Sequence, residues 1–515
     1  MTLTKDRHIG GYVHPDGLAV EPTTKSGAST LPDGQLAPVT DWPGIHLAVR
    51  DTDLVPAVHV DTRSRTGERI TMTMSPTGQS PAAGITVTTQ AEYDALGHDL
   101  LYPDDVFAIL PRVISHSVIV NMDPGTYAAK PSNLGPFYPR SATIKVPTDR
   151  QMTFEEFDIS DLRFINTGVY FVGSQGVDVA AQSGTVLAGG LLEVTGAGWT
   201  PDAYKGKFVQ FTAGVNAGTV TPIIGNTSDT LTMLYPWTTG ACTFEIVSPE
   251  VIFGNTGEAF YAALQAFNGI KVGFFDVAFG TEADPVGGAN IMGVGVAMVN
   301  VQYYTDTYIY MASFIDHARG GLSIEDSVIR IVSSVSGVRV GPSGYLSSVR
   351  TFIYGYATGG AGPRLLNLEN GIWRGNDTFI EADAAHGSNP VVIAQGQVRI
   401  EAAEPEIIGN GLGPGLYVTG QLDISGASDM SVSGCDVGIH VVNGGAVNGL
   451  TANVSSSDNV IGWLIEEGAT INVQNPQNIG ATTTDISIDG VAHPYSDLGS
   501  GDSITGVNGS RITRR

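Results

Sequence analysis

Acidic residues gather at three places in the second half of the sequence, and pairs of carboxylates are the groups that hydrolyse a glycosidic bond. One carboxyl donates a proton and the other acts as base or nucleophile, with roughly 5–10 Å between them. The chain carries 51 acidic residues, so the competing interpretation is a solvated surface with chance clusters. The candidate catalytic residues are Glu325, Asp326, Asp377 and Glu381. Further carboxylates of the same groups are Asp383, Glu401, Glu404 and Glu406.

A second grouping places an acid, a histidine and an arginine close together in sequence. Asp316, His317 and Arg319 could supply a base and a cation that stabilises negative charge, as a lyase requires. The sequence contains no Gly-x-Ser-x-Gly elbow, no His-Glu-x-x-His helix and no phosphate-binding loop. The ten histidines lack metal-ligand spacing, and His440 follows the strand pattern, which favours a place lining a coil. We therefore expect no metal site and no cofactor.

Aromatic residues in the middle of the chain form a second class of candidate site. A row of exposed rings can stack on sugar rings and bind a carbohydrate without cutting it. Tyr308 and Tyr310 alternate along one segment, so in a strand both side chains point to the same side. Tyr308, Tyr310 and Trp373 are the candidate carbohydrate-binding residues, and a buried core or an interface between subunits is the competing interpretation. The same stretch contains Tyr303, Tyr304, Tyr354 and Tyr356.

These side chains need a scaffold, and a repeat in the last third of the chain indicates which one. Four segments align, each an apolar stretch that ends near a glycine and continues into an alternating stretch. Gly396, Gly420, Gly445 and Gly468 are 24, 25 and 23 residues apart, about one coil of a parallel β-helix. The four segments cover residues 391–400, 416–424, 439–450 and 463–473.

Stacking explains why such a repeat folds. One coil cannot bury its inward side chains, whereas stacked coils enclose a continuous column of Val, Ile and Leu, and Gly or Asn tolerates positive φ at the bends. The leucine–asparagine pattern of leucine-rich repeats and the six-residue period of hexapeptide solenoids are both missing. Residues 322–332 have the same character, which extends the solenoid upstream. We predict an all-β protein built on a right-handed parallel β-helix, with Val441 and Ile465 facing its interior.

Composition agrees with many short strands and excludes several classes of protein. The chain has 66 glycines, 42% hydrophobic residues and 15% charged residues, with no Gly-X-Y period. A net charge of −25 repels phosphate backbones, and the only Lys/Arg cluster is the short Arg511–Arg515 stretch, so nucleic-acid binding is not expected. Two distant cysteines indicate folding in a reducing cytoplasm. The first residues lack an apolar export segment, and no run of about 18 apolar residues predicts membrane insertion.

Changes in residue character divide the chain into five parts. Residues 1–85 are rich in Pro, Gly, Asp and Thr, which predicts an arm or small β module that needs a neighbour to pack on. Residues 86–184 hold one or two short helices, the first preceded by a capping box of Thr89 and Glu92, and the first coils. Residues 185–248 alternate apolar residues with Gly and Asn turns, which predicts an inserted antiparallel β module. The main β-helix covers 249–480, and 481–515 form a tail.

Three local patterns resemble bacteriophage tailspikes and related virion proteins with a pectate-lyase-like β-helix. Residues 110–127 resemble the place where a capping helix ends in Leu-Pro and a first strand runs into a Gly-Thr-Tyr turn. Residues 198–231 resemble a small β module that interrupts the β-helix in the same group, and 484–490 resemble its exit segment. The resemblance spans about residues 110–490. The chain departs from the group because no C-terminal trimerising or self-cleaving chaperone domain is recognisable.

The resemblance implies a homotrimeric tailspike or tail-associated structural protein that contacts polysaccharide on the host surface. It implies attachment to other virion proteins through the N-terminal arm, assembly in the host cytoplasm and a final place in the virion. Two alternatives stay open. One is a tailspike that degrades the polysaccharide as a hydrolase or lyase, and the other is a capsid or baseplate decoration protein without a receptor.

Overall fold

The computed structural model describes most of the chain between residues 66 and 480, together with short strands outside that range. The continuous stretches are 66–111, 116–128, 168–235, 237–254, 271–292, 295–306, 308–312, 321–333, 337–357, 364–401, 404–425 and 429–480. The separate short stretches are 4–5, 12–13, 36–38, 47–51, 53–58, 113–114, 142–145, 151–152, 261–265, 484–489, 493–495 and 504–507. Most of the predicted arm and tail, and the candidates Asp316, His317 and Arg319, lie outside the described residues.

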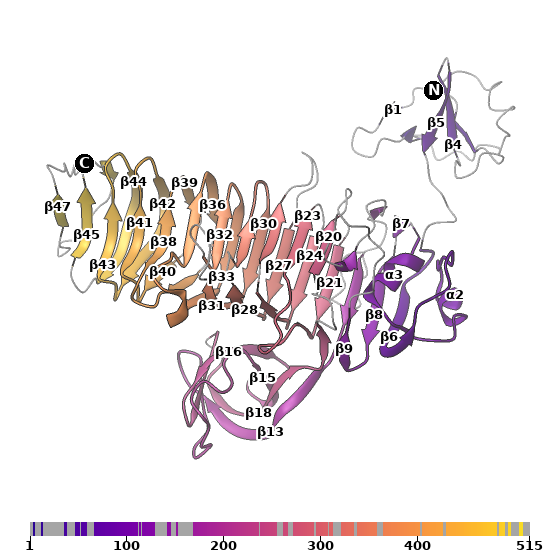
Figure 1. The fold of residues 1–515 in the computed structure, drawn as a ribbon, viewed down its shortest axis with the longest axis horizontal. Coiled ribbons are helices and arrows are strands. Elements are labelled where there is room, and N and C mark those ends of the chain that lie inside the picture. The colour runs from indigo at the N-terminus through magenta and orange to yellow at the C-terminus, as the bar shows by residue number, and fades with distance from the viewer. Residues whose placement is uncertain are drawn as a thin grey trace.

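Three columns of parallel strands make up most of the described chain (Figure 1). Each coil adds one strand to the first, the second and the third column in turn, and each strand pairs with the corresponding strand of the next coil. The first two columns belong to a 22-stranded sheet, and the third column is a 12-stranded sheet. The prediction of an all-β protein with a parallel β-helix is confirmed.

The strands of each column follow the chain from one coil to the next. The first column contains β6 (Ile70–Gln79), β8 (Val118–Met122), β12 (Val169–Val172), β21 (Lys271–Phe275), β24 (Gly295–Val299), β27 (Gly321–Glu325), β30 (Tyr345–Val349), β33 (Ile372–Asn376), β36 (Gln397–Glu401) and β39 (Gln421–Ser425). The second contains β9 (Gly125–Tyr127), β19 (Val251–Phe253), β22 (Val277–Phe279), β25 (Gln302–Thr305), β28 (Val328–Ser333), β31 (Phe352–Ala357), β34 (Phe379–Ala382), β37 (Glu406–Ile408) and β40 (Asp429–Ser433). The long strands β42 (Ala446–Ser457) and β44 (Thr470–Gly480) pass through both columns, and β46 (His493–Tyr495) pairs with β44.

The third column forms a sheet of its own. It contains β10 (Ala142–Lys145), β20 (Tyr261–Gln265), β23 (Ala289–Met292), β26 (Ile309–Ala312), β29 (Val338–Val340), β32 (Leu366–Glu369), β35 (Val392–Gln395), β38 (Pro414–Val418), β41 (Val437–Val441), β43 (Ile461–Ile465), β45 (Thr484–Asp489) and β47 (Ile504–Val507). Smaller pairings join β1 (Thr4–Lys5) to β2 (Tyr12–Val13), β7 (Val113–Ile114) to β11 (Gln151–Met152), and β3 (Leu36–Pro38) to β4 (Leu47–Asp51) and β5 (Asp53–Val58).

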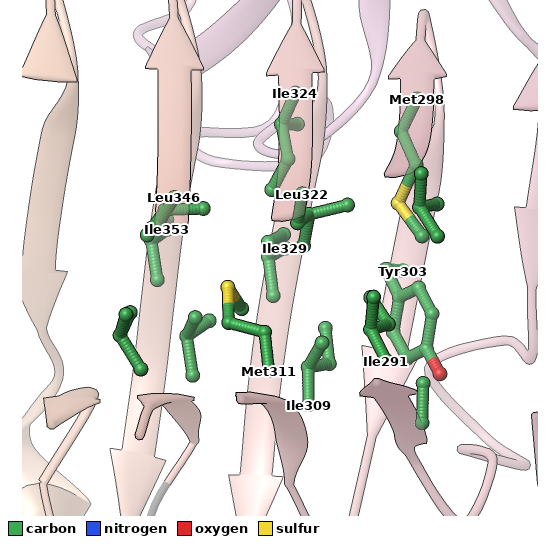
Figure 2. Packing of buried hydrophobic residues seen from close by; sticks show 14 of the residues in the cluster. Ile291, Met298, Tyr303, Ile309, Met311, Leu322, Ile324, Ile329, Leu346 and Ile353 are labelled. Carbon is green, nitrogen blue, oxygen red and sulfur yellow. The ribbon is translucent and has the colours of Figure 1, made fainter. Parts of the chain in front are cut away.

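Apolar side chains from all three columns fill the interior of the β-helix. Figure 2 shows Leu322 and Leu346 on neighbouring first-column strands, Ile353 from the second column and Met311 from the third. All four side chains are fully buried. Because every coil buries its apolar residues against the coils on either side, no single coil is expected to be stable alone.

Alternation along the third-column strands decides which residues face the interior. In β41, Val441 is fully buried whereas its neighbour His440 is partly exposed. Ile465 takes the same place in β43 and is 2% exposed. The prediction that Val441 and Ile465 face the interior is confirmed. The prediction that His440 lines a coil is wrong, because the alternation turns its side chain outward, where it contacts Glu466.

Two short helices precede the first complete coils. Helix α2 (Gln90–Asp94) starts after Thr89, and Thr89 and Glu92 make the predicted capping box. Helix α3 (Pro103–Ile109) starts with a proline and has two acidic residues in its first turn, as the positive end of the helix dipole favours. No helix in the described part of the chain is long and apolar enough to cross a membrane.

The glycine repeat reflects close approach between coils as well as backbone conformation. Gly396 and Gly468 have φ values of 69° and 79°, which glycine adopts without strain. At Gly420 the reason is contact, since a Cβ atom there would lie 2.2 Å from the backbone nitrogen of Gly396 in the preceding coil. A glycine spacing of one coil therefore marks a bend where neighbouring backbones touch.

A closed antiparallel barrel interrupts the β-helix between β12 and β19. Its strands are β13 (Gln175–Val186), β14 (Leu191–Glu193), β15 (Phe208–Gly214), β16 (Val220–Asn226), β17 (Thr230–Met233) and β18 (Gly240–Pro249). It has its own apolar core, which includes Phe211, Leu231 and Phe244. Gln175 at its start pairs with Pro249 at its end, so the chain leaves the β-helix and returns to it at nearly the same place.

The barrel packs on the outer face of the second column (Figure 1). Phe208 and Val247 of the barrel form one apolar cluster with Val328 and Phe352 of the second column. A hydrogen bond of 2.8 Å from Gln302 Nε2 to the carbonyl oxygen of Gly206 adds a polar contact. The barrel therefore covers an apolar patch on the β-helix.

The contact between barrel and β-helix depends on a glycine. A Cβ atom at Gly206 would lie 2.5 Å from Tyr354 Oη, and φ at Gly206 is 84°. We expect Gly206→Ala to lower the free energy of unfolding by about 1–3 kcal/mol more than a glycine replacement that causes only backbone strain. The matched control is Gly218→Ala, because Gly218 has φ of 85° and a Cβ atom there would meet no other atom within 4 Å. Equal losses in a denaturant titration would contradict the predicted clash.

Candidate functional site

A stack of left-handed turn residues positions several of the predicted carboxylates. Where the chain bends from the first to the second column, one non-glycine residue per coil has φ between 44° and 56°. The backbone N–H of Asn300 donates to Glu325 O and that of Asp326 donates to Val349 O, so successive bends are hydrogen-bonded to each other. We call these residues the turn ladder: Asp276, Asn300, Asp326, Arg350, Asp377 and Glu404.

Asp326 and Glu325 are held by the next member of the turn ladder. Arg350 Nε lies 2.7 Å from Asp326 Oδ1 and Arg350 Nη2 lies 2.7 Å from Asp326 Oδ2, a bidentate ion pair. Arg350 Nη2 also lies 2.5 Å from Glu325 Oε1. Burial raises the pKa of Asp326, against the opposing effect of the Arg350 hydrogen bonds. Since Arg350 engages both oxygens of Asp326, this geometry favours a structural ion pair over an acid–base pair.

Asp377 lies in a different setting, one coil beyond Arg350. Burial raises the pKa of the Asp377 carboxyl, and the neighbouring Glu404 raises it further. A carboxyl with a raised pKa beside a second carboxylate is the arrangement that a general acid requires. The structure therefore brings Asp377 together with Glu404, a residue that the sequence placed in another group.

Glu381 belongs to the contact between barrel and β-helix. Its Oε2 lies 2.7 Å from Lys205 Nζ of the barrel, and this ammonium also lies 5.4 Å from the centre of the Tyr354 ring. The nearby Asp383 accepts a hydrogen bond of 2.9 Å from Ala385 N at the start of a short 3₁₀ helix (Ala384–His386). Both carboxylates thus have structural contacts.

Glu406 is a candidate carboxylate for which burial is the single cause of a raised pKa, so its ionisation costs free energy. It lies in β37, in register with Phe379 of the preceding coil, and burial raises its pKa above the ordinary 4.5. The folded protein therefore holds a proton that the unfolded chain has released between those two pKa values. The stability due to this group is present below the ordinary pKa and is lost as the pH rises through the raised value.

We expect Glu406→Gln to raise the melting temperature at pH 7 and to leave it nearly unchanged at pH 4. A neutral side chain of the same shape removes the cost of a partly buried charge, and at pH 4 that charge is already absent. Melting curves from pH 4 to pH 8 measure the effect. Glu193→Gln, at an exposed residue of the barrel, is the control and should leave the melting temperature unchanged at both pH 4 and pH 8. An equal gain at both pH values would rule out ionisation as the cause.

The aromatic candidates separate into interior and surface residues. Trp373 is fully buried, and its indole Nε1 donates to Ser348 Oγ at 2.9 Å. The prediction that Trp373 binds carbohydrate is therefore wrong, because no sugar can reach its ring. Tyr303 is also in the interior, stacked on Phe279 with ring centres 4.8 Å apart. Tyr354 is 7% exposed and lies under the barrel.

Tyr308 and Tyr310 lie on the outer face of the third column, both partly exposed. Their ring centres are 6.4 Å apart and nearly perpendicular, as expected for side chains on the same side of a strand. The guanidinium of Arg339, in register with Tyr310 in the next coil, lies 5.0 Å from the Tyr310 ring centre. A tyrosine pair capped by an arginine presents an apolar ring face beside planar hydrogen-bond donors.

The same outward position continues across the following coils, mostly with planar polar and aromatic side chains, although Asn367 and the aliphatic Ile393 in the middle are buried. The register places one residue of each coil in line: Tyr310, Arg339, Asn367, Ile393, Tyr417 and His440. Four coil steps of about 4.8 Å separate Tyr310 from Tyr417, so the row extends roughly 19 Å between these two residues. We call this row the third-column face.

A polar cluster lies in the middle of the third-column face. Glu369 Oε2 accepts from Arg339 Nη2 at 2.7 Å, and Glu369 Oε1 accepts from Asn367 Nδ2 at 2.7 Å. Arg364 lies within 3.2–3.3 Å of the Gln395 side-chain oxygen when that amide faces the guanidinium. Asn367 is 1% exposed although it faces outward, so the long side chains around it cover it. We call Arg339, Arg364, Asn367, Glu369 and Gln395 the Arg339–Arg364 cluster.

Tyr417 and His440 form the other end of the third-column face. Their ring centres are 4.9 Å apart and nearly perpendicular, and His440 Nε2 lies 2.9 Å from Glu466 Oε1. Neither residue was among the predicted site residues, although the aligned repeats put Tyr417 and His440 at the same position of successive coils. Reading the outward position of each repeat down the alignment would have found this end of the face.

Neither the search for a metal site among the described residues nor the comparison of the sequence with protein families gave a match. Within the described residues, no group of three or more His, Cys, Asp or Glu side chains could hold a metal ion. Cys242 and Cys435 are buried free thiols. The sequence matches no protein-family model and no curated protein sequence.

Several solved structures have a similar course of the chain. A complex of XylC with xylose has 9% identity and a TM-score of 0.25, covering 84% of this chain and 76% of that one. The tailspike protein gp49 from Pseudomonas phage LKA1 has 10% identity and a TM-score of 0.19, with 87% and 73% covered. The Gp54 tailspike of Acinetobacter baumannii bacteriophage AP22, in complex with A. baumannii capsular saccharide, has 8% identity and a TM-score of 0.18, with 76% and 71% covered. Such low scores say nothing of ligand or activity. The chain is a parallel β-helix protein that carries an inserted antiparallel barrel.

Proposed function

We propose that this protein binds a bacterial surface polysaccharide along the third-column face, as a β-helical component of a phage tail. The observation that carries the proposal is the row of outward side chains from Tyr310 to His440, held in register by the parallel sheet. Sugar-binding sites combine ring faces with a few planar polar groups at fixed positions, and this row offers both. Rigid strands hold the row in place before a ligand arrives, which lowers the entropy lost on binding.

Alanine replacements on the third-column face test the proposal. We expect Tyr310→Ala and Tyr417→Ala each to weaken binding of a bacterial polysaccharide at least about fivefold, because truncated aromatic anchors typically cost more than about 1 kcal/mol. Binding is measured with the full chain on an array of purified capsular and lipopolysaccharide glycans. Tyr345→Ala is the matched control, since Tyr345 is a partly exposed tyrosine on the outer face of the first column. The proposal fails if no glycan binds, or if the control variant loses as much affinity as the other two.

The assembly and location of the protein form the second part of the proposal. A homotrimer joined to the virion through residues 1–85 would repeat the third-column face around an axis, and multivalent contact strengthens weak individual sites. Sedimentation at micromolar concentration should then give three times the chain mass of 53.8 kDa. A monomer at that concentration would remove the trimer from the proposal without affecting the binding face.

A polysaccharide-degrading enzyme is the second candidate function, and one observation favours it. Asp377 has a raised pKa beside Glu404, so it could donate a proton to a leaving sugar while Glu404 acts as base or nucleophile. Incubation with a glycan that the array identifies should then produce shorter fragments, and Asp377→Asn should abolish them. Intact glycan after prolonged incubation would leave binding as the function.

A further inference from the structure

The Arg339–Arg364 cluster contains one more positive charge than its carboxylates neutralise. Glu369 is the one carboxylate of the cluster, and its two oxygens are occupied by Arg339 and Asn367. Arg364 has no carboxylate within 4.0 Å in the described part of the chain, and its Nε has no hydrogen-bond partner there. Among the described residues, the side-chain partner of the Arg364 Nη atoms is the neutral amide of Gln395, with its oxygen turned towards the guanidinium.

This arrangement differs from that of the other described arginines that carry ion pairs. Arg330, Arg339, Arg350, Arg374 and Arg399 each have a carboxylate within 4.0 Å. Arg364 is partly buried and lacks such a carboxylate, although the chain has a net charge of −25 and many acidic residues. A partly buried guanidinium without a counter-ion costs free energy, so a chain keeps it more readily when a ligand supplies the missing charge.

The neighbours of Arg364 indicate what kind of anion fits. Glu369 and, more weakly, Arg339 both act electrostatically on Arg364, although Glu369 makes its direct contacts with Arg339 and Asn367. The Arg339 guanidinium lies 5.0 Å from the centre of the Tyr310 ring. Two planar guanidinium groups match the paired oxygens of a carboxylate, and the adjacent ring offers a surface for an apolar sugar face. The buried Oδ1 of Asn367 also lacks a hydrogen-bond partner, so the groups of the cluster do not satisfy one another.

We infer that the Arg339–Arg364 cluster is a subsite for the carboxylate of an acidic sugar. The inference rests on the proposed function and narrows it, since it names an anionic polysaccharide as the ligand. In the bound state the carboxylate takes the place of the missing counter-ion of Arg364, and the sugar ring lies towards Tyr310. The affinity then has an electrostatic part that decreases as salt is added.

Matched pairs of glycans test this assignment. Each carboxylated bacterial polysaccharide on the array is paired with its carbodiimide-reduced form, in which neutral hydroxymethyl groups replace the carboxylates. The full chain should bind at least one carboxylated member at least tenfold more tightly than its reduced partner. Arg364→Gln should abolish that preference and leave affinity for the reduced form unchanged. Arg399→Gln, at an exposed arginine on the outer face of the first column, should keep the preference.

A stability measurement distinguishes a binding role from a structural one. Arg364→Met keeps a long unbranched side chain at this position but removes the charge. If Arg364 serves a ligand, the melting temperature of this variant without glycan should equal or exceed that of the parent chain, and its carboxylate preference should be lost. A lower melting temperature together with an intact preference would assign Arg364 to the fold and overturn the inference.

The remaining outcomes separate this inference from the proposed function. Equal binding of carboxylated and reduced forms, with loss in Tyr310→Ala, would overturn the acidic subsite and keep polysaccharide binding. Arg364-dependent binding of sulfated or phosphorylated glycans alone would replace the carboxylate by another oxyanion and overturn the assignment as stated. If neither form of any glycan binds, both proposals fail.

Discussion

Val441→Asp is expected to unfold the C-terminal coils of the β-helix. Val441 is fully buried and lies between Val418 and Ile465 of the neighbouring coils. A carboxylate at this place would be ionised without a partner or would have to take up a proton, and both cost several kcal/mol. We expect a loss of more than about 4 kcal/mol in the free energy of unfolding, the range of the most damaging single substitutions.

Chemical denaturation followed by circular dichroism measures this loss. Val460→Asp is the matched control, because Val460 is 40% exposed and the substitution is chemically identical. The control should change the free energy of unfolding by less than about 0.5 kcal/mol. Similar stability of the two variants would show that Val441 does not face a closed interior, and the stacked-coil interpretation of this region would fail with it.

The second large effect is expected at the turn ladder, for Arg350→Ala. Arg350 holds both oxygens of Asp326, which is only 14% exposed, and one oxygen of Glu325. Removing the guanidinium leaves two adjacent carboxylates without a cation, and the loss of one partner of a buried ion pair costs about 3–5 kcal/mol. The loss should be largest at neutral pH and smaller near pH 3, because burial raises the pKa of Asp326 and its protonation removes the buried charge that Arg350 neutralises.

Arg374→Ala provides the control for this prediction. Arg374 is 53% exposed, and its nearest carboxylate oxygen, on Glu401, is 3.8 Å away. Exposed pairs contribute about 0–1 kcal/mol, so the control should be nearly neutral at every pH. Unfolding titrations at pH 3 and pH 7 compare both variants with the parent chain. A loss for Arg350→Ala that did not depend on pH would have to come from packing rather than from the carboxylates.

The fold could be predicted because its physical causes are local and repeat along the chain. Gly396 and Gly420 touch across neighbouring coils, so one structural requirement recurs once per coil and becomes visible as a spacing. The capping box joins Thr89 to Glu92, three residues later, so it can be predicted without knowing the tertiary structure. Such signals are strong because the sequence alone contains both partners at a fixed distance along the chain.

The site was harder to predict because its contacts join residues far apart in sequence. Glu381 pairs with Lys205, which is 176 residues away, and the residues around each of them give no sign of this contact. For Trp373 a local signal did exist, since the exposed Arg374 follows it and alternation then places the indole inside. Ser348, one coil earlier, supplies the partner that a buried indole N–H requires. The polar N–H of a tryptophan ring is therefore compatible with a fully buried side chain, as Trp373 shows.

The place where the barrel leaves the β-helix has a consequence for how such chains change over time. In the coil that carries the barrel, Gly173 N–H donates to Phe275 O, the bond position that Asp276 N–H occupies with Val299 O in the next coil. A whole barrel in one coil and the single residue Asp276 in the next thus occupy equivalent bends, and the strands on both sides stay in register. We expect that a bend of this kind can accept either insertion without a change of register. Exchange has one condition, because Val328 and Phe352 would lose their cover. A replacement cassette must bring its own apolar underside, or the uncovered patch becomes a place where molecules aggregate.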